Sequence, residues 1–207
     1  DYILTVAVSI SSGVAQITSA FPALLPYKVI MAVAIIGFIT VVNLRGVKES
    51  GAVFSIPTYF FLGIMGLTIA FGFYRYATGT LGTVTGVEFV TETAAPLTLF
   101  LILRAFSSGS TALTGIEAIS NGITAFREPR SRNAAKTLTA MSTILIVLFL
   151  SITFLSNQIA AVPSHTETVI SQLARTVFGD GNILYLMVIA GTALILLMAA
   201  NTSYADF

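Results

Sequence analysis

Charged residues are scarce in this sequence: of 207 residues only 9% are charged, whereas 56% are hydrophobic. A typical soluble domain carries about 25% charged residues, so a water-soluble fold would lack the polar groups that its surface needs. No charge occurs in 29–42, 52–73 or 138–155, and these stretches can lie in hydrocarbon without the cost of desolvating an ion. The composition therefore predicts an integral membrane protein.

Cysteine and tryptophan are both absent. The chain therefore has no disulfide, no cysteine metal site and no thiol nucleophile. The net charge of +1 provides no field that would hold nucleic acid, which we exclude as a partner. The sequence also lacks the P-loop, GxSxG, HExxH and CxxC patterns. We expect neither an enzyme nor a cofactor, apart from transported K⁺ or H⁺.

The hydrophobic residues fall into six long runs. A helix that crosses the hydrocarbon core needs ~20 apolar residues, so each run is a candidate span. We predict an all-α fold with a single transmembrane domain over residues 1–207. Because the chain opens inside one run and closes directly after another, we expect a fragment of a longer protein. The predicted spans are 1–19, 27–42, 52–74, 96–123, 138–155 and 183–200.

The linkers between these runs differ in positive charge. The linkers NLRGVKESG (43–51) and FREPRSRNAAKT (126–137) hold six basic residues, and the remaining linkers hold three. An excess of Lys and Arg marks the cytoplasmic side, so the first helix should run outward and the last inward. Within the linker 156–182, apolar residues at helical spacing predict a short helix against the bundle or in the membrane interface. These residues are Val169, Ile170, Leu173, Val177 and Phe178.

The first span carries a column of oxygen-bearing side chains. Asp1, Thr5 and Ser9 follow one another at intervals of four residues, which places them on one helix face. Such a column could bind a hard cation. In the alternative interpretation, Asp1 is a water-facing residue at a helix end, and the two hydroxyls bond back to carbonyls one turn earlier.

The fourth span contains polar and small residues near its middle, from Ser107 to Thr111 with Gly109 among them. This composition lowers helix propensity and is typical of a discontinuous helix at a binding site near the midplane. The alternative is a small-residue face that lets another helix approach closely. Arg104 and Glu117 flank the segment, and charges at that depth need a partner or water.

Three stretches resemble the amino acid-polyamine-organocation (APC) superfamily: NLRGVKESG, ALTGIEAISNGITAFREPRSRNAAKTL and NTSYADF. They are similar to the turn between its fourth and fifth helices, to its broken sixth helix with the following basic loop, and to the end of its eighth helix. The resemblance implies the LeuT/APC-type bundle of two inverted five-helix repeats. This chain would then cover about the third to the eighth helix.

Within that superfamily, the stretch DYILTVAVSISSG is most similar to the proton-coupled potassium importers of the KUP/KimA type. The resemblance implies that Asp1, Thr5, Ser9 and Thr114 bind K⁺, with Thr111 as a further ligand. It also implies that Glu117, together with Gly109, serves gating or proton coupling. The function expected is proton-coupled potassium uptake by alternating access.

Two other functions remain open at this point. An amino acid or polyamine permease of the same superfamily would differ in its first helix, which this chain does not include. A membrane scaffold or sensor that transports nothing belongs to another class. The expected partners are the lipid bilayer and a small solute or monovalent cation, and a homodimer is allowed for. The expected location is the cell membrane, crossed several times.

Overall fold

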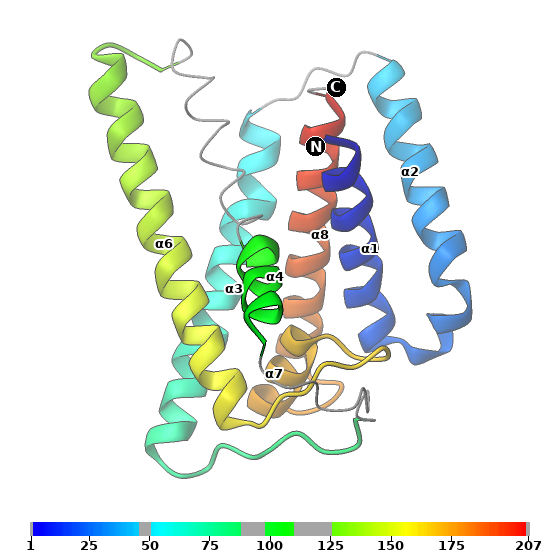
Figure 1. The fold of residues 1–207 in the computed structure, drawn as a ribbon, viewed down its shortest axis with the longest axis vertical. Helices are drawn as coiled ribbons and strands as arrows, with labels where there is room; N and C mark the ends of the chain where they lie inside the picture. The colour runs from blue at the N-terminus through cyan, green and yellow to red at the C-terminus, as the bar shows by residue number, and fades with distance from the viewer. Residues whose placement is uncertain (1, 46–50, 88–97, 110–125, 206–207) are drawn as a thin grey trace. The chain divides into compact units, whose positions relative to one another are not determined.

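The computed structural model describes residues 2–45, 51–87, 98–109 and 126–205. These residues form helices and no strand, so the all-α prediction is confirmed (Figure 1). The chain divides into two compact units, residues 1–90 with 151–207, and residues 91–150. The helical elements are α1 (Tyr2–Ala20), η1 (Pro22–Tyr27), α2 (Lys28–Leu44), α3 (Gly51–Ala77), α4 (Leu99–Gly109), α6 (Arg130–Gln158), α7 (Val169–Phe178) and α8 (Ile183–Ala205).

Five described segments are long and apolar enough to cross a membrane. They match five of the six predicted spans. The sixth, 96–123, is described only over α4, so its predicted discontinuity lies outside the described residues. The five segments are Tyr2–Ala20, Pro22–Leu44, Ser55–Ala77, Arg130–Gln158 and Ile183–Tyr204.

Two of the predicted linkers are partly helical. The connection after α1 forms the 3₁₀ helix η1. The basic linker 126–137 was expected to be a loop, but α6 already begins at Arg130. Arginine, alanine and lysine are good helix formers, and Asn133 Nδ2 donates to the Arg127 carbonyl at 2.9 Å, which ties the first turn to the preceding chain. The positive charge of this linker therefore does not mark the end of the helix.

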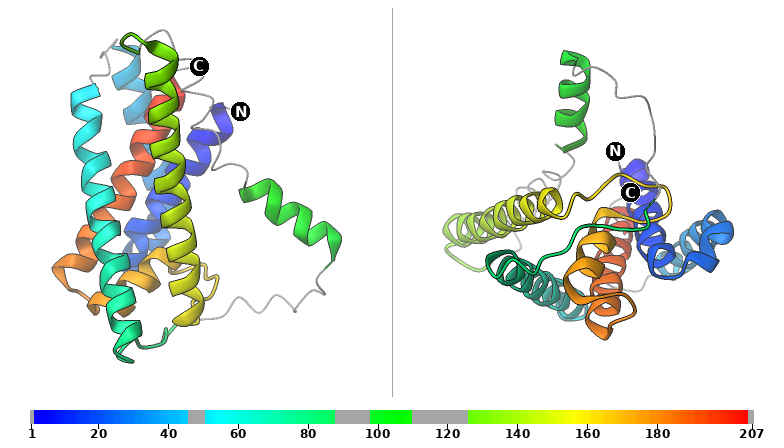
Figure 2. Two further views of the ribbon diagram at one scale, coloured as in Figure 1. Left: turned by 90° about the vertical axis from the view of Figure 1, so that its left-hand side faces the viewer. Right: turned by 90° about the horizontal axis from the view of Figure 1, so that it is seen from below.

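Helices α1 and α8 lie side by side, as Figures 1 and 2 both show. A β-carbon on Gly13 would lie 3.5 Å from Leu197 Cδ2 and 3.6 Å from the Ala193 carbonyl oxygen. Both are ordinary van der Waals distances, so position 13 lies in the contact with α8 and has room for a β-carbon. Residues from α1, α2 and α8 form a shared core, namely Val6, Ile10, Val14, Ile39 and Ala200.

Helix α8 also packs against α3. A β-carbon on Gly191 would lie 3.2 Å from Ile64 Cγ2 and 3.3 Å from Phe60 Cε1. A second core joins α3, the end of α6 within the larger unit, and α7. Its buried residues are Leu155, Ile159, Leu173 and Val177. The short helix α7 is thus part of the packed structure of this unit.

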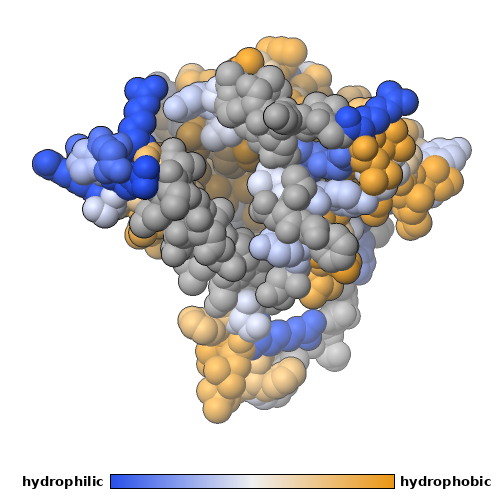
Figure 3. Space-filling view, turned by 90° about the horizontal axis from the view of Figure 1, so that it is seen from above, coloured by the Kyte–Doolittle hydropathy of each residue, from blue (hydrophilic) through white to orange (hydrophobic). Residues whose placement is uncertain are grey.

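The outward faces of the helices are apolar. Along α2, Val29, Ile30, Val33, Phe38 and Leu44 are all exposed. In Figure 3, hydrophobic residues make up much of the surface that the described residues present. Exposed apolar side chains along a span are what contact with lipid requires, which agrees with the membrane class deduced from composition.

Candidate functional site

Of the ligands predicted on the first span, the structure describes Thr5 and Ser9. Asp1, Thr111, Thr114 and Glu117 lie outside the described residues, so their predicted roles stay predictions. Gly109 is the last residue of α4, and a β-carbon there would meet no atom within 4 Å. The predicted gating role of Gly109 stays a prediction.

Ser9 is largely buried, with 8% of its surface exposed, and its hydroxyl makes no hydrogen bond among the residues that the structure describes. The oxygen is not closed off from solvent, because among the described residues Ser156 Oγ is the one buried side-chain atom without a partner. Thr5, one turn earlier, is partly buried and has an interaction partner. Two other serines of α1 do bond back along the helix, Ser11 to the Ala7 carbonyl and Ser19 to the Ala15 carbonyl, both at 2.7 Å. The back-bonding interpretation therefore does not hold for Ser9.

The polar face of α1 is longer than the sequence analysis predicted. After Ser9 it continues through Ser12, Gln16 and Ser19, at alternating intervals of three and four residues. At 3.6 residues per turn, the face from Thr5 to Ser19 spans an arc of about 80°. The same spacing was available in the sequence, so extending the pattern past Ser9 would have found these residues.

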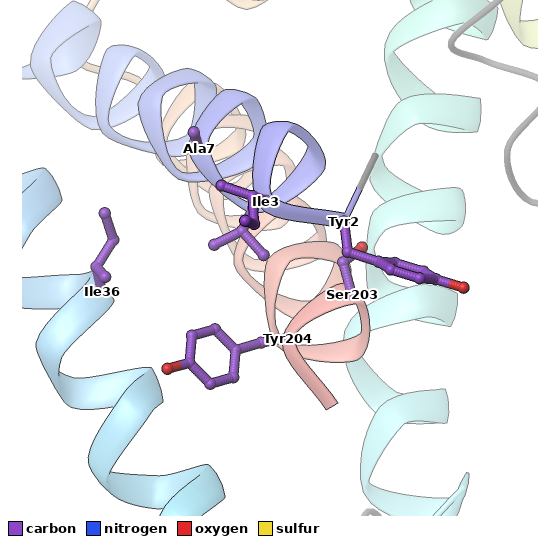
Figure 4. A pocket seen from close by; sticks show the side chains of 7 residues that line it. Tyr2, Ile3, Ala7, Ile36, Ser203 and Tyr204 are labelled. Carbon is purple, nitrogen blue, oxygen red and sulfur yellow. The ribbon is translucent and has the colours of Figure 1, made fainter. Parts of the chain in front are cut away.

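A cavity of about 290 Å³ lies between α1, α2 and α8 (Figure 4). In the figure, Ile36 of α2 and Tyr204 of α8 both border the gap. On α1, Ile3 and Ala7 line it, and they lie roughly 160° around the helix from Thr5 and Ser9. The cavity is therefore on the opposite face from the predicted ligands. Its lining is mostly apolar: Tyr2, Ile3, Val6, Ala7, Ile36, Ser203 and Tyr204.

At its far end, the polar face of α1 meets the start of α7. Thr168 is the N-cap of α7, and its side chain accepts a hydrogen bond from the Ser171 backbone N–H at 3.2 Å. The Thr168 hydroxyl donates to Gln16 Oε1 at 2.9 Å, and its backbone N–H donates to Ser19 Oγ at 3.0 Å. The predicted short helix is confirmed as Val169–Phe178, and it is joined to α1 by polar contacts.

The other end of α7 is held by Arg75 at the end of α3. Its Nη1 donates to the carbonyl oxygens of Thr176 and Val177, each at 2.8 Å, and its Nη2 donates to the Thr80 carbonyl at 2.7 Å. The last carbonyls of a helix lack partners within the helix and carry partial negative charge. The Arg75 guanidinium therefore satisfies and neutralises the C-terminus of α7.

An ion pair joins Glu167, just before the N-cap of α7, to Arg175 in its last turn. Arg175 donates from Nε to Glu167 Oε1 at 3.0 Å and from Nη2 to Glu167 Oε2 at 2.9 Å. The hydrogen bond to Glu167 raises the pKa of Arg175 above its usual value, so the guanidinium stays charged at any working pH. Ser171 adds a link to α8 through the Tyr185 hydroxyl at 2.9 Å. With a capped N-terminus, a capped C-terminus and contacts to three helices, α7 is stable although it has only ten residues.

Comparison of the sequence with known proteins assigns the chain to a family. The sequence profile described as "Amino acid permease" matches residues 1–207. The chain is 46% identical over 207 residues to the "Potassium transporter KimA" of Bacillus subtilis (strain 168). The match covers 100% of this chain and 34% of that protein, so the chain spans about a third of its relative's length. The chain belongs to the amino acid permease family of the APC superfamily, whose members are transporters in the cell membrane.

Proposed function

We propose that the complete gene product imports potassium as a secondary active transporter, coupled to protons and working by alternating access. The observation that carries this proposal is the identity of 46%, over all 207 residues, to a protein named a potassium transporter. The Ser9 hydroxyl supports it, because it makes no hydrogen bond among the described residues and its oxygen stays accessible, and is therefore available to a ligand.

The proposed ligands are chemically suited to potassium. Hydroxyl and carboxylate oxygens replace the water around a weakly hydrated monovalent cation. We assign this role to Thr5 and Ser9 on α1, to Asp1, and to Thr111 and Thr114. An ionisable carboxylate at membrane depth can also carry a proton, and Glu117 is proposed for proton coupling and gating together with Gly109.

An amino acid or polyamine permease is the second candidate. The family description "Amino acid permease" favours it. Uptake of labelled amino acids by the wild-type protein, without potassium uptake, would establish this candidate. A scaffold or sensor is the third, and predicts that replacing Ser9 alters stability or assembly without altering affinity for any solute.

The proposal needs no cofactor beyond the transported ions and no enzymatic step. We place the basic ends of the spans in the cytoplasm, which puts α7 on the outer side. Lipid is the proposed environment of the exposed apolar faces. The homodimer stays a prediction, which cross-linking of the complete protein in native membranes tests.

The experiment is growth of a potassium-uptake-deficient bacterium at limiting potassium, with the wild-type complete protein beside its Asp1→Asn variant. We expect rescue by the wild type and loss of rescue with the correctly inserted variant. Ser11→Ala is the matched control, because Ser11 lies on the exposed side of α1 and bonds back to Ala7. A wild type that is inserted and folded but does not rescue would overturn the potassium proposal.

A further inference from the structure

Helix α6 is longer than a membrane span requires. It runs as one unbroken helix of 29 residues from Arg130 to Gln158 (Figure 1), and at 1.5 Å per residue its length is about 43 Å. The hydrocarbon core of a bilayer is about 30 Å thick, and the bilayer with its headgroup layers is about 40–45 Å thick. At least one end of α6 therefore extends into a headgroup layer.

The distribution of charge shows which end of α6 extends. Residues 138–155 contain no charged residue, and this stretch is about 27 Å long, close to the thickness of the hydrocarbon core. The preceding turns hold Arg130, Arg132 and Lys136 and continue the helix for about 12 Å beyond that stretch. The structure thus puts three cationic side chains on a regular helix at the depth of the lipid headgroups.

Two of these cations share one face of α6. Arg132 and Lys136 are four residues apart, so their side chains lie within about 40° of each other around the helix axis. Both are exposed, and neither forms a hydrogen bond or an ion pair with any residue that the structure describes. Ala134, about 160° away from each of them, is buried with 4% of its surface exposed. The Arg132–Lys136 face therefore points away from the packed side of α6.

The third cation is already paired. Arg130 Nε lies 3.1 Å from Glu128 Oε1, and Arg130 is about 160° around the helix from Arg132. Membrane topology requires positive charge at this end of the span, but it does not require that the unpaired cations share one outward face. Two unpaired cations on one face, in a layer that contains phosphodiester groups, are complementary to an anionic lipid.

The same face continues into the membrane in a form that suits acyl chains. Thr139, Thr143 and Leu150 all lie within about 20° of Arg132 around the axis, and all three are exposed. The Thr139 hydroxyl donates to the Ala135 carbonyl and the Thr143 hydroxyl donates to the Thr139 carbonyl, each at 2.8 Å. Because these hydroxyl hydrogens are used within the helix, the face presents no free donor to hydrocarbon.

We propose that the Arg132–Lys136 face binds the phosphate of an anionic phospholipid in the cytoplasmic leaflet, whose chains lie along Thr139, Thr143 and Leu150. The Arg132 guanidinium donates to two phosphate oxygens at once, and the Lys136 ammonium adds a second positive charge. This lipid holds the start of α6 at the membrane surface. The proposal goes beyond potassium transport and does not depend on which solute the protein carries.

Quenching by brominated lipids tests this face locally. In the complete protein, with any other tryptophans replaced, Thr139→Trp puts a fluorophore beside the proposed site in mixed bilayers. Brominated phosphatidylglycerol should be preferred over brominated phosphatidylcholine as a quencher by about thirtyfold, or about fivefold for each basic residue. Arg132→Gln with Lys136→Gln should abolish the preference, and Arg132→Lys with Lys136→Arg should retain it. An equal preference in the glutamine variant and the unaltered protein overturns the site.

A tryptophan on another helix is the control. Val41→Trp lies on the exposed side of α2, and its lipid preference should not change when Arg132 and Lys136 are replaced by glutamine. An equal loss of preference at positions 41 and 139 shows a general effect of net charge and overturns the site.

Inorganic phosphate distinguishes a lipid from a soluble anion. In an uncharged detergent, phosphatidylglycerol should raise the melting temperature of the complete protein above its value in phosphatidylcholine, since a ligand that binds the folded state stabilises it. The glutamine variant should melt like the wild type in phosphatidylcholine and lose the gain. Sodium phosphate at matched ionic strength should give no gain; a gain that the glutamine variant loses overturns the lipid assignment. Neither experiment measures transport, so failure of this site leaves the proposed potassium function standing.

Discussion

The Thr168 hydroxyl on α7 donates a 2.9 Å hydrogen bond to Gln16 Oε1 on α1, across a separation of 152 residues. The same threonine caps α7 by accepting the N–H of Ser171. One side chain thus ends the polar face of a spanning helix and begins a short helix outside the spans. This double role means that changes at Thr168 affect both the stability of α7 and the orientation of Gln16.

Removing the Thr168 cap should destabilise the protein measurably. Thr168→Ala should lower the free energy of unfolding by about 1 kcal/mol, the usual loss for an N-cap, and by somewhat more if the contact to Gln16 contributes. Thr168→Ser should be close to neutral, because serine is an equally good cap. Thermal unfolding of the detergent-purified complete protein measures both variants, and equal stability of Thr168→Ala and wild type would contradict the capping role.

Arg75 should be needed to hold α7 in place. Arg75→Gln removes the charge-assisted hydrogen bonds to the carbonyls of Thr176 and Val177, and we expect a loss of ~1–3 kcal/mol. Hydrogen exchange should then rise in Val169–Phe178 before it rises in α8. Arg45→Gln, on an exposed residue at the end of α2, is the control and should leave exchange in α7 unchanged.

Two glycines should respond in opposite ways to an added methyl group. Gly191→Ala places a β-carbon 3.2 Å from Ile64 Cγ2 and 3.3 Å from Phe60 Cε1, so these packed side chains must move by a few tenths of an ångström, which we expect to cost about 1–3 kcal/mol. Gly37→Ala meets no atom within 4 Å and should stabilise α2 by about 0.5–1 kcal/mol. Unfolding midpoints of the two variants test the α3–α8 contact, and a neutral Gly191→Ala would contradict it.

Much of this architecture could be predicted from the sequence. The apolar runs located five spans, and the spacing of Val169, Leu173 and Val177 located α7, because hydrophobic periodicity is a local property. The start of α6 at Arg130 was missed, since charge was taken as a sign of a loop although arginine, alanine and lysine favour helix.

The candidate site was predicted only in part, for a physical reason. The spacing of Thr5 and Ser9 gave one face of α1, but the sequence does not reveal which face α8 covers or which hydroxyls bond back to the helix. How far Ser9 is buried, and whether its hydroxyl makes a hydrogen bond, both depend on that packing. The contact of Gln16 with Thr168 joins distant parts of the chain, and no local pattern in the sequence predicts such a pairing.

Ser9 should contribute directly to cation affinity. Ser9→Ala removes the unpartnered hydroxyl and nothing that α1 uses to hold its own backbone. We expect KM for potassium to rise about three- to tenfold, as for one lost ligand of modest energy, with thermal stability preserved. Ser11→Ala, which removes only a back-bonded hydroxyl on the exposed side, should leave KM unchanged. Equal effects of the two substitutions would contradict a ligand role for Ser9.

The central claim is that this chain carries part of a proton-coupled potassium site. Uptake of potassium into proteoliposomes that contain the purified complete protein, with an inwardly directed proton gradient, tests it most directly. We predict uptake that rises with the gradient, is abolished by a proton carrier, and is lost with Asp1→Asn. Uptake of an amino acid under the same gradient, without potassium uptake, would contradict the account.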